Sequence, residues 1–389
     1  MIMIRLIVLY VFVCFTTIFQ AQIIEYNKCN YSIITDSTVS LASFKITANK
    51  LNDNILILDS IISHKKRRYK VDNIEEFAFK TNSKALSCYL NGIKQIILPN
   101  TLSTIGPRVF HGYFNSLQRV DLPEKITSIG NNSFANLPSL TEVKIKGITK
   151  INDWSYSLNP SLTIVNIDTC VNIIGKNTFF NCTRLKTINI ENVKQIDEHA
   201  FEGTAIETLN ISNCKIIGEF SFADCRKINS IEFSNSLHQI SNFAFYNNTA
   251  LKSLFVPSGI IGESAFMGCT SLNNVVLSDN VDSIGQAAFY DCSALNNINI
   301  PSSISKIEAM TFMNCINLKQ IVLPNTISLI GESAFAGSGL SEIVIPASVS
   351  EIHHNAFANC KELKTVIIHG DNIKLGDNVF PNYANILKR

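Results

Sequence analysis

Charged residues are scarce in this sequence of 389 residues. Lysine, arginine, aspartate and glutamate together make up 16% of the chain, and their formal net charge is only +2. Proteins that bind nucleic acid usually carry a strong basic field, so this balance argues against a nucleic-acid partner. The one dense basic run, Lys65–Arg68, is short, and we interpret it as a solvated hairpin tip rather than a polyanion site.

Long apolar runs are also missing, except at the N-terminus. There Arg5 precedes the apolar run Leu6–Phe19, and the small residue Ala21 follows. This order is typical of a secretory signal peptide, so we predict that residues 1–21 are removed. An uncleaved signal anchor is the alternative, because Phe19 is a poor residue three positions before the cleavage point. No second run of about 20 apolar residues follows, so we expect a secreted or cell-surface protein without a membrane span after signal removal.

The sequence carries no signature of a catalytic or cofactor site. It contains no phosphate-binding P-loop, no G-x-G-x-x-G and no H-E-x-x-H. Gly262-x-Ser264 resembles half of a nucleophile elbow, but Phe266 stands where the second glycine belongs. The adjacent histidines His353 and His354 lack cysteine or carboxylate partners at the spacing of a metal site. We therefore predict a protein that has no catalytic residues, no cofactor and no bound metal.

What the sequence does contain is a repeat, marked by a column of aromatic residues. After a first gap of 31 residues, successive members lie 21 to 24 residues apart. The column consists of Phe79, Phe110, Phe134, Tyr156, Phe179, Phe201, Phe222, Phe245, Phe266, Phe289, Phe312, Phe335, Phe357 and Phe380. Self-similarity at such a period predicts about fourteen copies of one unit, stacked as a solenoid.

The copy that begins at Leu318 indicates how one unit folds. Ile321 and Leu323 are two residues apart, so their side chains share one face of a strand. Pro324 ends that strand because it cannot donate to the ladder, and Gly331 permits a tight corner. One unit cannot bury its own apolar face, but stacked units bury a continuous core. We predict a right-handed repeat solenoid of the α/β class, mostly β, with one parallel sheet and turns or short helices at its corners.

The segment before the regular repeats, residues 22–73, departs from the period. Ile55–Leu58 and Tyr69–Val71 are predicted strands on either side of the basic run, so we expect an N-terminal capping hairpin with that run at its tip. The long first gap between aromatic residues places an insertion near Ser83–Gly92. The repeat domain then covers residues 74–389.

These units resemble the BspA-like leucine-rich repeats of surface and secreted proteins. Units of that family read L-x-x-I-x-L-P-x-x-I-x-x-I-G-x-x-A-F-x-x-C, and Leu295–Cys315 follows the pattern nearly throughout. The resemblance covers about residues 55–380. It implies an adhesin or interaction scaffold without catalysis, whose ligand is an extracellular protein of the host matrix, of serum or of a microbial surface. A structural surface or matrix component that associates with itself is the alternative.

Most of the cysteines also follow the repeat. The column three residues after the aromatic position contains Cys182, Cys225, Cys269, Cys292, Cys315 and Cys360. Stacked repeats point their Cβ atoms the same way, which leaves neighbours too far apart for a disulfide, so we predict small buried hydrophobic residues. Cys29 and Cys88 lie outside the column, and our hypothesis is a disulfide between them that fixes the cap.

The sequence also contains N-glycosylation sequons, which permit a glycan without requiring one. Their asparagines are Asn30, Asn131, Asn181, Asn210 and Asn247. Asn30 is the best candidate, because it lies in the least repetitive segment.

One position of each strand is expected to point out of the solenoid. It holds Ile97, Asp121, Lys144, Asn166, Asn189, Asn210, Glu232, Phe255, Val276, Asn299, Val322, Val344 and Ile367. The column is polar from Asp121 to Glu232 and apolar afterwards, except at Asn299. An exposed apolar run usually marks a partner surface, although β-branched residues also suit strands for their own sake. The partner-binding residues of this hypothesis are Phe255, Val276, Val322, Val344 and Ile367.

Overall fold

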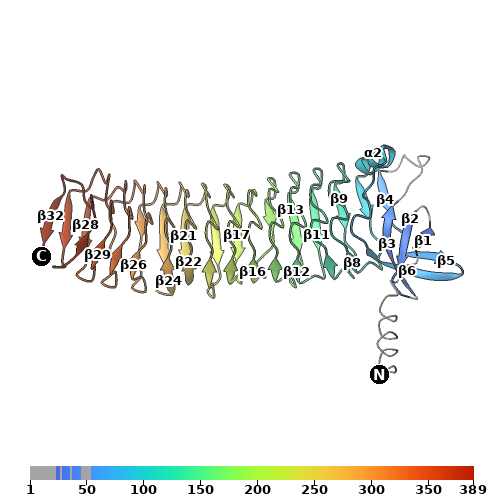
Figure 1. The fold of residues 1–389 in the computed structure, drawn as a ribbon, viewed down its shortest axis with the longest axis horizontal. Coiled ribbons are helices and arrows are strands. Elements are labelled where there is room, and N and C mark those ends of the chain that lie inside the picture. The colour runs from blue at the N-terminus through green and yellow to red at the C-terminus, as the bar shows by residue number, and fades with distance from the viewer. Residues whose placement is uncertain (1–22, 27–28, 36, 45–53) are drawn as a thin grey trace, which may run out of the picture.

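The computed structural model describes residues 23–26, 29–35, 37–44 and 54–389. They form an elongated solenoid that begins at a cap of antiparallel strands (Figure 1). The predicted signal peptide, residues 1–21, lies outside the described residues. Within the described part of the chain, no helix is both long and apolar enough to cross a membrane.

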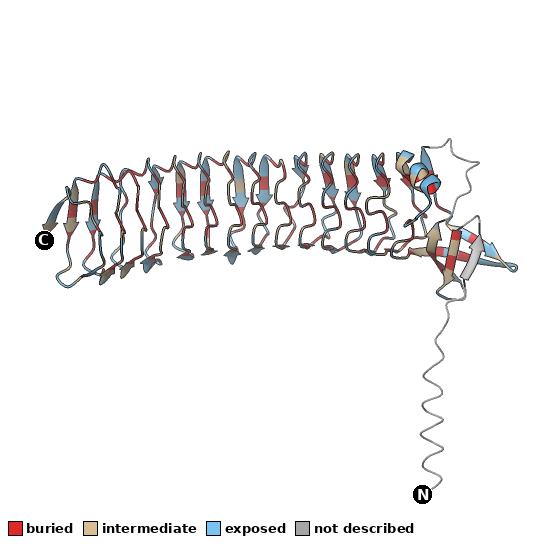
Figure 2. Cartoon of the chain, turned by 45° about the horizontal axis from the view of Figure 1, so that its top comes forward, coloured by how far each residue is buried: buried red, intermediate tan, exposed pale blue. Residues whose placement is uncertain are grey.

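One side of the solenoid is a ladder of parallel strands of two to four residues, which we call the long-strand face. Its strands are β4 (Ile55–Ile57), β7 (Gln95–Ile97), β9 (Arg119–Asp121), β11 (Glu142–Ile145), β13 (Ile164–Ile167), β15 (Thr187–Ile188), β17 (Thr208–Ile211), β19 (Ser230–Phe233), β21 (Ser253–Val256), β23 (Asn274–Leu277), β25 (Asn297–Ile298), β28 (Glu342–Ile345), β30 (Thr365–Ile368) and β32 (Asn385–Lys388). Burial alternates along them, as Figure 2 shows, so one set of side chains faces the core and the other faces solvent.

A second ladder of parallel strands runs along another side of the solenoid. Its strands are β8 (Thr104–Ile105), β10 (Ser128–Ile129), β12 (Lys150–Ile151), β14 (Ile173–Ile174), β16 (Gln195–Ile196), β18 (Ile216–Ile217), β20 (Gln239–Ile240), β22 (Gly259–Ile261), β24 (Val281–Ile284), β26 (Lys306–Ile307), β27 (Leu329–Ile330), β29 (Glu351–Ile352) and β31 (Lys374–Leu375). The mostly β solenoid is confirmed, but it has parallel sheets on two sides, whereas we predicted one. In each copy, the isoleucines three residues apart, such as Ile327 and Ile330, have the local pattern of a turn. Stacking nevertheless brings their backbone groups within hydrogen-bonding distance of the next copy.

The aromatic column is the centre of the core. Every successive pair of rings from Phe79 to Phe380 is stacked, with ring centroids 4.9 to 5.8 Å apart. The cysteine column lies beside it, and its thiols are free and buried, as predicted. The Cys225 thiol, for example, donates to the carbonyl oxygen of Phe201 at 3.0 Å. Burial raises the pKa of Cys225 to about 12, so these residues act as small hydrophobic side chains.

The predicted insertion is an α-helix, α2 (Lys84–Gly92). Ser83 caps its N-terminus, because the serine side chain accepts a hydrogen bond from the Leu86 amide. Leu86 and Leu90 are buried and attach the helix to the array.

The cap contains five further strands. They are β1 (Ile23–Tyr26), β2 (Cys29–Ile33), β3 (Thr38–Phe44), β5 (Ile61–His64) and β6 (Arg67–Ile74). The first three pair antiparallel in order, β3 pairs parallel with β6, and β6 pairs with β8. The cap sheet is therefore continuous with the second ladder.

The basic run lies at a hairpin tip, as predicted, but one strand of that hairpin was assigned wrongly. Lys65 and Lys66 have φ of 48° and 67°, which makes a two-residue turn that pairs His64 with Arg67. So tight a turn pairs the strands that adjoin it, β5 and β6. The more distant segment Ile55–Leu58 contributes β4 instead, which pairs with β7 and begins the long-strand face.

Candidate partner-binding surface

The outward column of the long-strand face lies where the repeat predicts it. Ile97 pairs with Asp121, Asp121 with Lys144, and Phe255 with Val276 in the strand registers. We call its apolar residues Phe255, Val276, Val322, Val344 and Ile367 the apolar stripe. Four of them are exposed, with relative accessibilities of 53% for Phe255, 41% for Val276, 83% for Val322 and 39% for Val344, and Ile367 is half-buried.

The stripe is not one continuous run. Phe255 pairs with Val276, and Val344 pairs with Ile367. Val322 stands between these pairs on a segment that forms no strand, which explains its high exposure.

Asn299 interrupts the stripe without projecting a free polar group. Its Oδ1 accepts a hydrogen bond from the Leu277 amide at 2.9 Å, and its Nδ2 donates to the Leu277 carbonyl oxygen at 2.7 Å. Asn189 holds the backbone of Ile167 in the same way. These asparagines replace ladder hydrogen bonds, so Asn299 presents little unpaired polarity to a partner.

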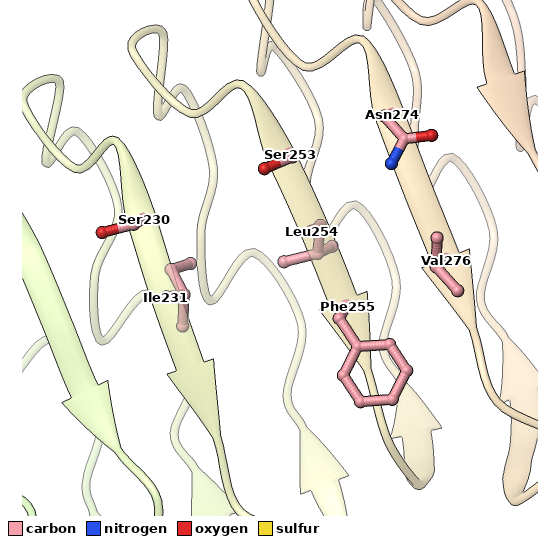
Figure 3. A pocket seen from close by; sticks show the side chains of 7 residues that line it. All are labelled: Ser230, Ile231, Ser253, Leu254, Phe255, Asn274 and Val276. Carbon is pink, nitrogen blue, oxygen red and sulfur yellow. The ribbon is translucent and has the colours of Figure 1, made fainter.

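A pocket of about 300 Å³ opens beside Phe255 (Figure 3). Its lining consists of Ser230, Ile231, Ser253, Leu254, Phe255, Asn274 and Val276. The pocket coincides with a break in the long-strand face, because one sheet ends at β19 and the next begins at β21. A bulky apolar side chain of a partner would fit such a recess better than it would fit a flat strand face.

The repeat pattern does not predict this pocket, although one residue of β19 departs from the pattern there. β19 carries Phe233 at an inward position, where the paired strand β17 carries the smaller Ile211. The Phe233 ring packs edge-on against Phe245, with ring centroids 5.8 Å apart. Ile231, the other inward residue of β19, is only half-buried and lines the pocket.

Two of the charged residues in the polar half of the outward column, Asp121 and Lys144, are paired within their own strands. Arg119 forms an ion pair with Asp121 at 2.9 Å, and Lys144 pairs with Glu142 at 3.5 Å. Each pair lies within one strand, so neither partner depends on a ligand. Exposed pairs of this kind are worth little energetically, and they leave a hydrated surface.

A second surface was also missed, along a corner of the solenoid. The residue two positions before the repeat aromatic is itself a ring in several copies, as at Trp154, His199, Phe220 and Phe243. Phe180, which directly follows the repeat aromatic, lies beside Trp154 and His199. In the sequence, these rings form a second aromatic column with the same period as the first. The first column has more members, so it dominates the pattern.

The remaining chemical candidates are explained by the fold. Ser264 is buried within a corner, so the partial nucleophile elbow presents no accessible hydroxyl. His353 lies 3.4 Å from Glu351, whereas His354 lies 3.3 Å from Asp377, so the two histidines have different partners. Across the described residues, no group of three histidine, cysteine or acidic side chains is placed to hold a metal.

The proposed Cys29–Cys88 bridge is not formed in the structure. Cys29 is buried in β2, and Cys88 has a free thiol on the exposed side of α2.

The sequons differ in accessibility. Asn131 and Asn210 are exposed, whereas Asn30, Asn181 and Asn247 are half-buried. Asn247 also uses its Nδ2 to donate to Asp224 at 2.6 Å. Exposure therefore favours Asn131 and Asn210 as glycan acceptors over Asn30, which lies within the cap sheet.

Comparison with known proteins identifies the class. The chain matches the family described as BspA type leucine rich repeat region in overlapping segments between residues 59 and 387. The protein therefore belongs to the BspA-type leucine-rich repeat family. No curated protein matches it.

Several solved structures share the fold. A leucine-rich repeat protein from Bacteroides ovatus aligns with a TM-score of 0.65 and 21% identity, over 94% of this chain and 99% of the other. A leucine rich cell surface protein from Faecalibacterium prausnitzii aligns with a TM-score of 0.54 and 24% identity, over 90% and 95% of the two chains. The pneumococcal vaccine antigen PcpA aligns with a TM-score of 0.51 and 15% identity, over 95% and 99%.

Proposed function

We propose that this chain is a secreted or cell-surface protein that binds an extracellular protein ligand through the apolar stripe, without a reaction of its own. The exposed ring of Phe255 beside the pocket at the β19–β21 break is the observation that carries the proposal. Aromatic residues next to a recess are the usual energetic centres of protein interfaces. The ligand class is a protein of the host matrix, of serum or of another microbial surface.

The similar structures support the location, since one of them is described as a cell surface protein and another as a vaccine antigen. A predicted signal peptide at residues 1–21 is consistent with export. The scaffold also suits a binding role, because a solenoid presents a long surface whose outward residues can vary without disturbing the core.

The test is a pull-down from serum and matrix extracts with the secreted chain and with a variant that carries Phe255→Asp and Val322→Asp. Both residues are exposed, so the variant should fold, as circular dichroism and thermal unfolding can verify. We expect the ligand captured by the natural chain to be lost from the variant. Asn166→Asp introduces one charge of the same sign in the polar half of the same column, and it should retain binding.

Two results would contradict the proposal. One is unchanged capture by the folded double variant, which would place the binding surface elsewhere. The other is equal loss of capture by Asn166→Asp, which would indicate a general effect of added charge.

Self-association is the second candidate, favoured by one observation. Among the described strands, β32 pairs only with β30, so its other edge is open. Ile386 lies opposite the buried Val366 in register, but it is 46% exposed. An open edge with exposed apolar residues can template pairing with another chain. Size-exclusion chromatography over a range of concentrations, with Ile386→Lys as the variant, tests this candidate.

A further inference from the structure

Five rings contact one another in succession along one corner of the solenoid, in an arrangement that we call the corner ladder. Its members are Trp154, Phe180, His199, Phe220 and Phe243. His199 and Phe220 stack with ring centroids 5.0 Å apart, and Phe220 and Phe243 stack at 4.7 Å. Phe180 contacts Trp154 and His199 edge-on at 6.0 and 6.5 Å. Trp154 is exposed and the other four are half-buried, so the ring edges form a surface.

The fold does not need rings at this corner. Trp154, His199, Phe220 and Phe243 all have a positive φ, between 52° and 61°. Bulky residues seldom adopt this conformation, whereas asparagine adopts it readily. Other copies place small or polar residues there with nearly the same φ. These include Asn132, Asn177, Ser264, Ser333 and Asn355.

Carboxylates accompany the rings. Glu219 precedes Phe220, Glu198 precedes His199, and Glu263 occupies the same position in the copy that follows Phe243. Glu198 already pairs with Lys176 at 2.9 Å. Glu219 and Glu263 are exposed, and neither has an ion pair with any residue that the structure describes.

This combination suits lysine and arginine side chains. Their aliphatic stems can pack against ring edges while the cationic heads reach the neighbouring carboxylates. The faces of Phe220 and of His199 are occupied by each other, so the match depends on ring edges and carboxylates rather than on cation–π contacts.

The chain itself carries a segment with that chemistry. Lys65, Lys66, Arg67 and Arg68 are all exposed at the tip of the β5–β6 hairpin. The hairpin projects from the cap end of the molecule, as Figure 1 shows, whereas the corner ladder belongs to turns in the middle of the solenoid. One molecule therefore cannot place its own tip on its own ladder.

We propose that the basic hairpin tip of one copy docks on the corner ladder of a second copy. The tip and the ladder are different surfaces, so a docked pair still has one free tip and one free ladder, and an open chain of copies can grow. Because the charges involved are exposed, salt screens the attraction and weakens the assembly. This contact uses neither the apolar stripe nor the open edge of β32.

Sedimentation velocity at low salt, over a wide range of protein concentration, tests the proposal. We expect the natural chain to associate as concentration rises and to dissociate as salt is added. One variant reverses the ladder charges, with Glu219→Lys and Glu263→Lys. The other reverses the tip charges, with Lys65→Glu, Lys66→Glu, Arg67→Glu and Arg68→Glu. Each variant alone should stay monomeric, and an equal mixture should associate, because every tip then meets a ladder of opposite charge.

Matched controls separate the ring contribution from the charge contribution. Glu332→Lys alters the same repeat position beside Ser333, where no ladder ring is present, so association should be unchanged. Phe220→Ser removes a ring at a position where Ser264 and Ser333 show that serine is accepted. It should raise the dissociation constant of self-association by roughly tenfold or more.

Three outcomes would overturn the proposal. The first is a natural chain that remains monomeric at every concentration at low salt. The second is association of either charge-reversed variant as strong as that of the natural chain. The third is association that persists in both reversed variants and disappears with Ile386→Lys, which would place the contact at β32 instead.

Discussion

Phe255 and Val276 lie opposite each other in the register of β21 and β23, and both side chains point away from the core. Together with Leu254 and Ile231 they surround the pocket at the β19–β21 break (Figure 3). An exposed ring beside a break in the hydrogen-bonded ladder has little to contribute to folding. Its contribution to stability should therefore differ sharply from that of its buried neighbour.

Phe255→Ala and Leu254→Ala are expected to have very different effects on stability. Leu254 is 4% exposed, so its truncation leaves a cavity and should cost about 2 to 5 kcal/mol of unfolding free energy. Phe255 is mostly exposed, so its truncation should change that free energy by no more than about 0.5 kcal/mol. Urea unfolding of both variants measures the difference. A large loss from Phe255→Ala would mean that the ring supports the fold, and would weaken its assignment to binding.

Tyr156→Phe is expected to stabilise the protein. Tyr156 is the one tyrosine in an aromatic column otherwise made of phenylalanine, and its buried hydroxyl has no hydrogen-bond partner. Burial raises the pKa of this tyrosine well above its ordinary value. Removing an unsatisfied buried hydroxyl should gain about 1 kcal/mol of unfolding free energy. Chemical denaturation checks this, and a loss of stability would imply a bound water or another partner for the hydroxyl.

Buried and exposed cysteines are expected to differ in their reactivity toward an alkylating reagent. The thiolate is the reactive form, and burial raises the pKa of Cys182, Cys225 and Cys269 to about 12. These thiols should stay unmodified in the native protein at pH 8, whereas the exposed Cys88 should be alkylated. Brief iodoacetamide treatment followed by peptide mapping tests the division. If Cys88 resisted alkylation until reductant was added, the result would contradict this division and support the hypothesis of a disulfide with Cys29.

The same pKa shifts predict alkaline instability. A thiol whose pKa is raised in the folded state favours the protonated form there, so its contribution is complete below the unfolded pKa of about 8.5. That contribution is lost as the pH rises toward the folded value of about 12 for Cys225. The unfolding free energy should therefore fall above about pH 9. Cys225→Ala should make the fall shallower, as denaturation at a series of pH values would show.

Much of the fold follows from residues that repeat. The aromatic spacing predicts the stacked rings, and the alternation of Ile321 and Leu323 predicts which side chains are buried, as both are. The second ladder could not be predicted from local sequence, because its strands pair between successive copies. Gln195 and Ile216, for example, are paired although they are 21 residues apart in the chain. The break between β19 and β21 is likewise a matter of pairing between copies that are distant in the chain.

The surface was less predictable than the core for a related reason. Periodicity identifies every residue that faces outward, but it does not distinguish Val322, on a segment that forms no strand, from Val276, which lies in a ladder. Nor does it indicate that Asn299 turns back onto the backbone of Leu277. The exposure of an outward side chain and the hydrogen bonding of its polar atoms both depend on the neighbouring copy. Neither could therefore be predicted from the period alone.

Phe220 and Phe222 offer the sharpest comparison between corner and core, because they are two residues apart and belong to different columns. Phe222→Ala should cost about 3 to 5 kcal/mol, since Phe222 is fully buried between Phe201 and Phe245. Phe220→Asn removes two stacked pairs, with His199 and with Phe243, each worth about 0.5 to 1.5 kcal/mol. It also relieves a φ of 52°, which asparagine adopts more easily than phenylalanine.

These two effects of Phe220→Asn nearly cancel, so its unfolding free energy should lie within about 1 kcal/mol of that of the natural chain. Thermal and urea unfolding of both variants give the comparison. A loss from Phe220→Asn as large as that from Phe222→Ala would mean that the corner ladder stabilises the solenoid. The rings of the corner ladder would then have a structural explanation, and the docking of the hairpin tip would rest on the carboxylates alone.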